Sequence, residues 1–445
     1  MKKIFLSLAV IVSICVSSVA QKSVVPNHEW FEDARFGMFV HFGPYSVLCN
    51  GEWVMNTQSI TVSDYHKLQK IFDPRLFDAK KWVATVKEAG MKYIAFTSRH
   101  HDGFSNWNTK LSDWNIMNTP YGKDLVKQLA DECHRQGIKL VLYYSLLDWS
   151  RDDYSFTTGR TGQKTGRTEQ KEWTSYINFM KAQLTELLTN YGEISGIWFD
   201  GEWDQLPSED SGVAVTHSMS KVDWHFGEIY DLIHKLQPNC MIANNHHLAA
   251  LPGEDYQAFE KDLPGENVGG GFAANQVVAK HLPLETCETI NSSWGYSLRD
   301  NKYKSEKELI HLLVRAAGYG ANLLLNVGPM PTGEFDEISV SRLQYMGKWL
   351  SSYGQTIYGT RGGMIKPQTW GAVTQKSNVY YIHILNKESD VLTLSFPENI
   401  QSVRWLNGSE KITWKQNKKS GEATFNLNNI PDEIDSIIEV IFKNK

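Results

Sequence analysis

The sequence has 445 residues and a formal net charge of −5, so it is too long for one ordinary domain and has no basic excess. This charge argues against nucleic acid or an anionic membrane surface as partner, because both require clustered positive charge. Aromatic residues make up 12% of the chain, with 15 Trp, a composition that suits contact with the apolar faces of sugars.

The first 20 residues have the pattern of a secretory signal peptide. Lys2 and Lys3 supply a positive start, residues 4–16 are apolar, and residues 18–20 (SVA) form a small-residue cleavage site. The apolar run is too short to span a membrane, and no later run reaches the ~18 apolar residues that a spanning helix needs. We therefore expect secretion, to a bacterial periplasm, and no membrane span.

Four cysteines remain after the leader, and they are far apart in the sequence without a CxxC pair. They are Cys49, Cys133, Cys240 and Cys287. A chain of this length can build a hydrophobic core without a disulfide framework, so we expect these residues to be buried thiols.

Predicted strands and helices alternate from residue 24 to residue 358, which is typical of a parallel sheet wrapped by helices. The predicted strands are residues 37–41, 92–97, 139–145, 194–200, 240–244, 285–290 and 321–326. The predicted helices are residues 78–89, 123–135, 168–190, 222–236, 305–317 and 339–353. Residues 246–271 are rich in Gly, Pro and acidic residues and contain no convincing helix. We therefore predict an α/β fold, an irregular (β/α)8-like TIM barrel over residues 24–358.

The composition changes in residues 359–445. Short runs of β character follow one another, separated by turn residues such as Asn407 and Gly408. These runs are residues 379–384, 391–394, 403–406, 423–427 and 437–442. Their spacing predicts a second domain, a small C-terminal antiparallel β-sandwich.

Polar and aromatic side chains stand at the ends of five successive predicted strands. Packing explains any one of them, but in α/β barrels the carboxyl ends of the strands form the catalytic face. The residues at the first four strand ends are His41, His100, His101, Tyr143, Trp198 and Asp200, and a loop after the first strand adds Glu52 and Trp53. We therefore expect the functional site at this end of the barrel.

Several chemistries compete for these residues. A metal-dependent hydrolase using His100, His101 and Asp200 is one alternative, but the chain has no HxH or HExxH pattern, and we expect no metal and no cofactor. A GxSxG nucleophile elbow is absent as well. Carboxylates remain, and glycoside hydrolysis needs two of them. The pattern alone offers Asp200 with any of Glu254, Asp255, Glu260, Asp262, Glu266, Glu285 and Glu288.

Seven short motifs together carry a family resemblance. In chain order they are HFGPYS, GEW, RHHDGF, LYYSLLDW, WFDGEW, SSWGY and NLLLNVGP, spread over residues 30–329. This combination resembles the family 29 glycoside hydrolases, the retaining α-L-fucosidases, whose fold is an irregular barrel followed by a β-sandwich. The resemblance implies that Asp200 is the nucleophile. It implies sugar-binding roles for His41, Glu52, Trp53, His100, His101, Tyr143, Trp198 and Trp294.

Two further roles follow from the resemblance. The general acid/base of some members ends a D-aromatic-x-x-x-E segment, which here is residues 255–260 and selects Glu260, with Glu285 as the alternative. Many relatives carry NDRW after the fifth strand, with the Arg touching the sugar. This chain has NNHH, so His246 stands in place of that Arg and is a further candidate for sugar binding.

The expected activity is removal of terminal α-L-fucose from a fucosylated oligosaccharide or glycoconjugate, by an exo-acting, retaining double displacement. A non-catalytic protein that binds fucosylated glycans on the same fold is the alternative. An intact Asp200 and an available Glu260 favour the enzyme.

Overall fold

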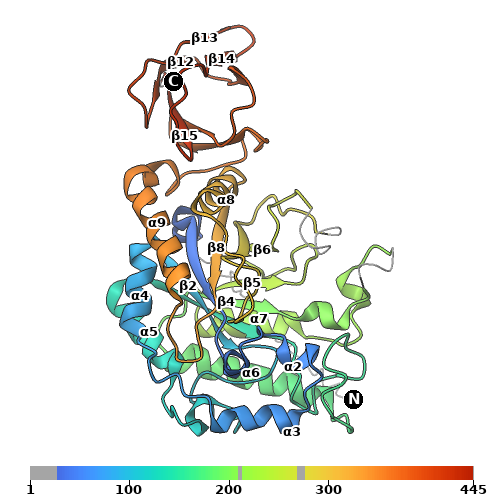
Figure 1. Cartoon of the computed structure of the whole chain (residues 1–445). Coiled ribbons are helices and arrows are strands. Elements are labelled where there is room, and N and C mark those ends of the chain that lie inside the picture. Colours follow the sequence, from blue (N-terminus) through green and yellow to red (C-terminus); the bar gives the residue numbers. More distant parts are fainter. Residues whose placement is uncertain (1–27, 209–212, 268–275, 444–445) are drawn as a thin grey trace, which may run out of the picture.

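The computed structural model describes residues 28–208, 213–267 and 276–443 (Figure 1), so the predicted signal peptide lies outside the described residues. An eight-stranded parallel sheet, in the order β5-β4-β3-β2-β1-β8-β7-β6, forms the barrel. Its strands are β1 Phe36–Val40, β2 Tyr93–Arg99, β3 Lys139–Ser145, β4 Gly196–Asp200, β5 Met241–Asn245, β6 Gln257–Glu260, β7 Leu284–Thr289 and β8 Ala321–Val327. The two end strands meet where the backbone N–H of Asp255 donates to the carbonyl of Ile242 at 2.8 Å.

Strand β3 shows why these segments form a barrel. Its residues are apolar on both faces, as expected for a parallel strand covered on both sides. Leu140 and Leu142 pack in the main hydrophobic core outside the sheet, whereas Val141 and Tyr143 pack in a second cluster inside the barrel. The alternation follows from the two-residue period of a strand, and it aims Tyr143 into the barrel.

The helices cover the outside of the sheet, and acidic or Ser caps fix where several of them begin. Asp78 accepts hydrogen bonds from backbone N–H groups at the start of α4, Asp124 does the same for α5, and Ser305 forms a capping box with Glu308 on α8. The helices are α1 Glu29–Ala34, α2 Val54–Thr57, α3 Val62–Tyr65, α4 Ala79–Glu88, α5 Leu125–Gln136, α6 Trp173–Asn190, α7 Phe226–Leu236, α8 Glu306–Gly318 and α9 Glu337–Tyr353.

The second half of the barrel is irregular, as predicted. Within the described residues no helix separates β5 from β6 or β6 from β7. One strand was not predicted here: Gln257–Glu260, between Gly- and Pro-rich segments, is strand β6, paired in parallel with β7. Glu260 is therefore the last residue of a barrel strand, and its position is fixed by the sheet.

The C-terminal segment forms two antiparallel sheets, in the orders β12-β15-β10-β9 and β11-β14-β13, with a hydrophobic core of their own. Their strands are β9 Gly371–Lys376, β10 Val379–Ile384, β11 Val391–Ser395, β12 Ile400–Trp405, β13 Trp414–Gln416, β14 Glu422–Asn426 and β15 Ser436–Phe442. The sandwich lies at one end of the molecule beside α8 (Figure 1), where His311 contacts the carbonyl of Ile434 at 2.8 Å. The fold class is therefore confirmed, although β9 and β13 were not predicted.

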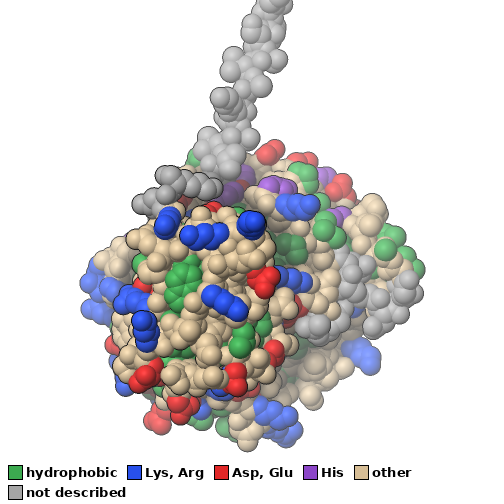
Figure 2. Space-filling view, turned by 90° about the horizontal axis from the view of Figure 1, so that it is seen from above, with side chains coloured by type: hydrophobic (Ala, Val, Ile, Leu, Met, Phe, Trp, Pro, Cys, Tyr) green, Lys and Arg blue, Asp and Glu red, His purple; other side chains and the backbone are tan. Residues whose placement is uncertain are grey.

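The surface charge and the state of the cysteines match what the sequence predicts. On the face seen in Figure 2, basic and acidic side chains lie interspersed over the described residues. None of the helices found in the described ranges is long and apolar enough to cross a membrane. Cys133, Cys240 and Cys287 are buried and Cys49 is partly buried, and all four are free thiols, as expected.

Candidate active site

A cavity opens at the carboxyl ends of the barrel strands and gathers most of the predicted site residues. Nine of them line it: His41, Trp53, His100, His101, Tyr143, Trp198, Asp200, Glu260 and Trp294. Two predicted residues, Glu52 and His246, do not. Seven lining residues were not predicted, and they are Phe39, Arg160, Thr161, Trp203, Asn245, His247 and Cys287.

Asp200, the last residue of β4, is held by donors on both carboxylate oxygens. The Tyr143 hydroxyl donates to Oδ2 at 2.8 Å and the Trp203 indole N–H donates to Oδ1 at 2.8 Å. Burial raises the pKa of Asp200 to about 6, with a further contribution from the charge of Glu260, and the two hydrogen bonds act in the opposite direction. The carboxylate is therefore oriented, and it is close to its protonation point at mildly acidic pH.

Glu260 faces Asp200 from the end of β6. Its Oε2 accepts a hydrogen bond from Asn245 Nδ2 at 2.8 Å and lies 3.3 Å from His247 Nε2. Burial acts to raise the pKa of Glu260, but the hydrogen bonds and charge of His247, with the Asn245 amide, outweigh it and lower that pKa. In the free site, the proton of the pair is therefore held more tightly by Asp200 than by Glu260.

One amide nitrogen bridges the two acids. Asn245 Nδ2 lies 2.8 Å from Glu260 Oε2 and 3.4 Å from Asp200 Oδ1. Two carboxylates that reach the same nitrogen are close neighbours, and a retaining glycosidase needs its two carboxyl groups ~5–5.5 Å apart. Asn245 therefore sets the spacing of the pair.

Two histidines of the cavity, His41 and His101, are neutral hydrogen-bonding groups. Nδ1 of His41 lies 2.7 Å from Oδ1 of Asn326, whose amide nitrogen donates to a carbonyl, so Nδ1 of His41 is the donor. Nδ1 of His101 likewise donates to Ser145 Oγ at 2.7 Å, because that hydroxyl donates to a carbonyl. Burial lowers the pKa of His41 to about 4 and that of His101 to about 3. Each ring therefore has its lone pair on Nε2, which can accept a hydrogen bond from a hydroxyl group; Nε2 of His101 lies 3.5 Å from Asp200 Oδ2.

An ion pair beneath the cavity supports these histidines. Arg99, which precedes His100 and His101, is fully buried, pairs with buried Asp148 and donates to the carbonyl of Ser145 at 2.9 Å. This pair connects the ends of β2 and β3, so the histidine-bearing segment is fixed by charge as well as by packing.

Aromatic rings form the inner wall of the cavity. Tyr143 stacks on Trp198 with ring centroids 5.6 Å apart, and Trp294 lies 5.2 Å from the ring of His41. Below them Glu285, which is fully buried, accepts the indole N–H of Trp198 at 3.0 Å. Burial raises the pKa of Glu285 to about 7, yet its side chain does not line the cavity.

Glu52 supports the wall from outside. It is 6% exposed, and its Oε2 accepts the backbone N–H of Gly295 at 2.7 Å. A second contact, from the N–H of Gly51 to the carbonyl of Tyr296 at 3.0 Å, joins the same two loops. Glu52 therefore holds the loop that carries Trp294, and in this structure it does not reach the cavity.

His246 points away from the cavity, which corrects the expectation that it takes the place of the sugar-binding Arg. Its Nε2 lies 3.0 Å from Glu254, and its Nδ1 accepts the N–H of Leu248 at 3.0 Å. The adjacent residue His247, in the left-handed conformation with φ +62°, is the one that reaches the cavity. Sequence position alone could not distinguish the two, because the backbone leaves the strand geometry after Asn245.

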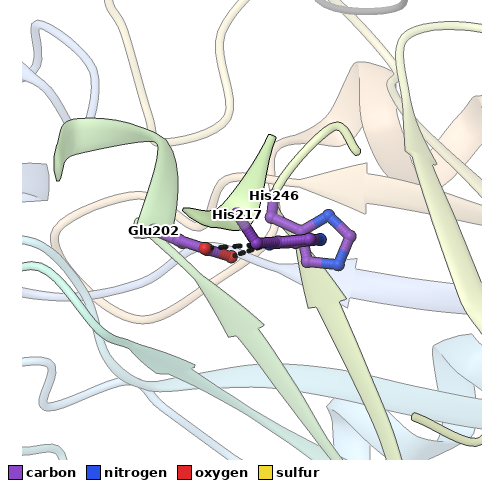
Figure 3. A group of neighbouring side chains, drawn as sticks. All are labelled: Glu202, His217 and His246. Carbon is purple, nitrogen blue, oxygen red and sulfur yellow. Dashed lines mark hydrogen bonds and ion pairs between the residues drawn. The ribbon is translucent and has the colours of Figure 1, made fainter. Parts of the chain in front are cut away.

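Beside the site, the ligand atoms of Glu202, His217 and His246 lie within 4.8 Å of one another (Figure 3), a spacing that a metal ion could use. Nδ1 of His217 lies 2.9 Å from Glu202 and its Nε2 lies 2.8 Å from the carbonyl of Ala249, so both nitrogens donate and neither offers a lone pair. Burial acts to lower the pKa of His217, but the hydrogen bond and charge of Glu202 outweigh it and raise that pKa. The cluster therefore contains an ion pair between buried Glu202 and partly exposed His217, which ties three loops together.

Comparisons with known proteins agree with this geometry. A family model described as alpha-L-fucosidase matches residues 15–355. The α-L-fucosidase of Dictyostelium discoideum is 29% identical over 402 residues, which cover 84% of this chain and 81% of the relative. The human tissue α-L-fucosidase is 30% identical over 432 residues, which cover 89% of this chain and 84% of the relative.

Solved structures show the same similarity. The α-L-fucosidase isoenzyme 1 from Paenibacillus thiaminolyticus is 32% identical, with a TM-score of 0.78 over 94% of this chain and 99% of its own. An α-L-fucosidase from Bacteroides thetaiotaomicron, solved as a trapped covalent intermediate, is 25% identical, with a TM-score of 0.76 over 94% of this chain and 96% of its own. The family model spans most of the barrel and the folds coincide, and the chain therefore belongs to the α-L-fucosidase family, family 29 of the glycoside hydrolases.

Proposed function

We propose that this protein is an exo-acting, retaining α-L-fucosidase with Asp200 as nucleophile and Glu260 as general acid/base. The observation that carries the proposal is the pair of carboxylates bridged by Asn245 inside a cavity lined by histidines and aromatic rings. The proposed substrate is a fucosylated oligosaccharide or glycoconjugate, of which one terminal sugar enters the cavity.

In the first step Asp200, ionised, attacks the anomeric carbon while Glu260, protonated, gives its proton to the leaving oxygen. His41 and His101 accept hydrogen bonds from sugar hydroxyls through their Nε2 atoms, and Trp294 packs on an apolar face of the ring. A sugar of another configuration leaves these buried acceptors unpaired, which costs orders of magnitude in rate.

In the second step Glu260, now ionised, removes a proton from water, and the water opens the fucosyl ester on Asp200 with overall retention. The donors from Asn245 and His247 stabilise Glu260 in this ionised state. Over the two steps, the glycosidic C–O bond and one O–H bond of water are broken. A C–O bond from the sugar to the water oxygen and an O–H bond on the leaving group are formed, so the reaction balances with water as the only co-reactant.

The free site holds its shared proton on Asp200, whereas the first step needs it on Glu260. Positive charge develops at the anomeric carbon in the transition state, and this charge favours ionised Asp200 directly beneath it. The proton therefore moves to Glu260 as the substrate approaches the transition state. The two acids titrate as a coupled pair, and the active form carries one proton in total.

The test is hydrolysis of an aryl α-L-fucoside followed by NMR of the first-formed sugar. The proposal expects turnover and α-L-fucose as the initial product. Initial β-L-fucose indicates an inverting enzyme, and binding without turnover indicates a glycan-binding protein. Loss of activity in excess chelator supports the metal-dependent alternative built on His100, His101 and Asp200.

Three further statements are part of the proposal. Residues 1–20 act as a signal peptide and direct the protein to secretion into a periplasm.

Residues 24–358 are the catalytic domain, and residues 359–445 are a separate domain that supports the barrel and supplies no catalytic carboxylate. Mutating its acids one at a time (Glu388, Asp390, Glu410, Glu422) should leave turnover of a small fucoside within a few-fold, and a large loss in a folded variant would refute this assignment.

A further inference from the structure

Trp203 touches the proposed nucleophile. Its indole N–H donates to Asp200 Oδ1 at 2.8 Å, and the Tyr143 hydroxyl donates to Oδ2 at 2.8 Å. Each carboxylate oxygen thus has one short donor, and the remaining contacts of Asp200, to Asn245 at 3.4 Å and His101 at 3.5 Å, are longer. Two aromatic side chains therefore fix the plane of the carboxylate.

The backbone after Asp200 turns back so that the indole returns to the nucleophile. Gly201 has φ +114°, and a Cβ at this position would lie 2.8 Å from the backbone nitrogen of Leu147. Only Gly can adopt this positive φ and also leave room for the backbone of Leu147. Trp203 follows in the short 3-10 turn η4, Glu202–Gln205, three residues after the carboxylate that it contacts.

Both neighbours of Trp203 in this turn are buried acids anchored on other loops. Glu202 is 1% exposed and is bound by the cationic ring of His217 (Figure 3). Asp204 is fully buried and accepts hydrogen bonds from the hydroxyl of Tyr154 at 2.6 Å and from the hydroxyl of Thr161 at 2.7 Å. The turn is therefore braced on both sides, and the indole has little freedom to leave Asp200.

The ring of Trp203 also lines the cavity and stacks on Trp53, with centroids 5.6 Å apart and planes 16° apart. Among the described residues, no hydrogen bond from the Trp53 indole to Asp200 is present. The stacked pair thus contains one Trp that contacts the nucleophile and one that does not, and this makes Trp53 a matched control.

We propose that Trp203 is a positioning residue of this enzyme: its indole N–H orients Asp200 and stabilises its ionised form, so that the proton needed for the first step can pass to Glu260. This inference rests on the proposed role of Asp200 as nucleophile. Removing the donor favours protonated Asp200 and moves the shared proton away from Glu260. Two consequences follow together: a smaller share of the one-proton form has its proton on Glu260, and the pair retains that proton to higher pH.

The experiment compares the Trp203→Phe and Trp53→Phe variants by the pH dependence of kcat/KM for an aryl α-L-fucoside. Trp203→Phe keeps an aromatic ring against Trp53 and loses only the donor. For Trp203→Phe, we expect the basic limb of the kcat/KM pH profile to move up by roughly one pH unit. The maximal kcat/KM should fall by roughly tenfold, the effect of one hydrogen bond to a charged group. Trp53→Phe should leave the pH of the basic limb unchanged, even if the variant has a different KM.

A second variant guards against a folding defect. In Trp203→His the Nε2 of the smaller ring can occupy the place of the indole nitrogen, so the limb should return toward that of the unchanged protein. An unmoved limb in a folded Trp203→Phe protein overturns the inference, and so does an equal shift in Trp53→Phe. Loss of activity in Asp200→Gly with rescue by azide tests the nucleophile separately. Failure of that test therefore refutes the proposed function and not the role of Trp203 alone.

Discussion

The indole N–H of Trp198 donates to Oε1 of Glu285 at 3.0 Å, so Glu285 lies behind the aromatic wall of the cavity. A second donor, the hydroxyl of Tyr93, occupies its other oxygen. Burial raises the pKa of Glu285 to about 7, a value expected of a general acid, but a general acid must also reach the leaving oxygen. Geometry therefore favours Glu260, which lines the cavity, over Glu285, which does not.

The first prediction separates the two acids. Glu260→Ala should scarcely affect the first step with an activated aryl fucoside but severely slow cleavage of a natural fucosyl disaccharide, because only a poor leaving group needs a proton. Azide should rescue the slowed second step and yield α-fucosyl azide, because it takes the place of water in opening the β-linked fucosyl ester on Asp200. Steady-state kinetics on both substrates and NMR of the product measure this. If Glu285→Ala has this signature and Glu260→Ala does not, the assignment is wrong.

The second prediction concerns pH. Because the active form carries one proton on the coupled pair, kcat/KM should be bell-shaped. The basic limb should lie near pH 6, where Asp200 loses the shared proton, and the acidic limb should lie below the ordinary pKa of a Glu side chain, since that of Glu260 is lowered. A profile that stays flat from about pH 5 to pH 8 would contradict this reading of the pair.

The third prediction concerns His217 and stability. Its folded pKa is raised, so the stabilisation from its ion pair with Glu202 is complete below the unfolded pKa and is lost as pH rises through the folded value. His217→Gln should therefore lower the melting temperature more at about pH 6 than at about pH 9. His311, whose pKa burial lowers, gives the control, because the penalty of His311→Gln should be smaller at the lower pH.

If His217→Gln lowers the melting temperature equally at both pH values, the third prediction is wrong. That result would mean that His217 contributes packing alone and that its ring is not charged in the folded protein.

The fourth prediction compares a buried and an exposed ion pair. Arg99→Leu leaves Asp148 buried without its partner and should cost about 3–5 kcal/mol of unfolding free energy. The matched variant Arg361→Leu breaks a pair with Asp33 whose side chains are 44% and 48% exposed, and should cost under about 1 kcal/mol. Denaturant unfolding measures both values. Equal losses of unfolding free energy in the two variants would mean that burial does not make the Arg99–Asp148 pair more costly to break than the exposed pair.

Much of the fold could be predicted because the signals were local. The strand 139–145 coincides with β3, and helices that begin at an acidic or Ser cap were placed to within a few residues. Strand β6 was missed because it has four residues between Gly- and Pro-rich segments, and its pairing with β7 comes from the sheet as a whole. Strand β13 is shorter still, with three residues.

The site was predicted unevenly for a similar reason. Asp200 is the last residue of β4, so the two-residue period gives its direction, and His101 follows the end of β2 by two residues. His247 and Trp203 depend on turns whose path the sequence does not state, although the Gly201 that follows Asp200 was a signal for the turn that returns Trp203. Glu52 carries a family motif, yet its burial against Gly295 becomes visible only in three dimensions.

The most direct test of the central claim is to trap the reaction on the enzyme. A 2-deoxy-2-fluoro-α-L-fucosyl fluoride slows both steps and has a good leaving group, so the fucosyl ester should accumulate. Mass spectrometry of the digested protein should find one fluorofucosyl group, attached to Asp200. Attachment to another residue, or time-dependent turnover with no adduct even in Glu260→Gln, would contradict a retaining mechanism through Asp200.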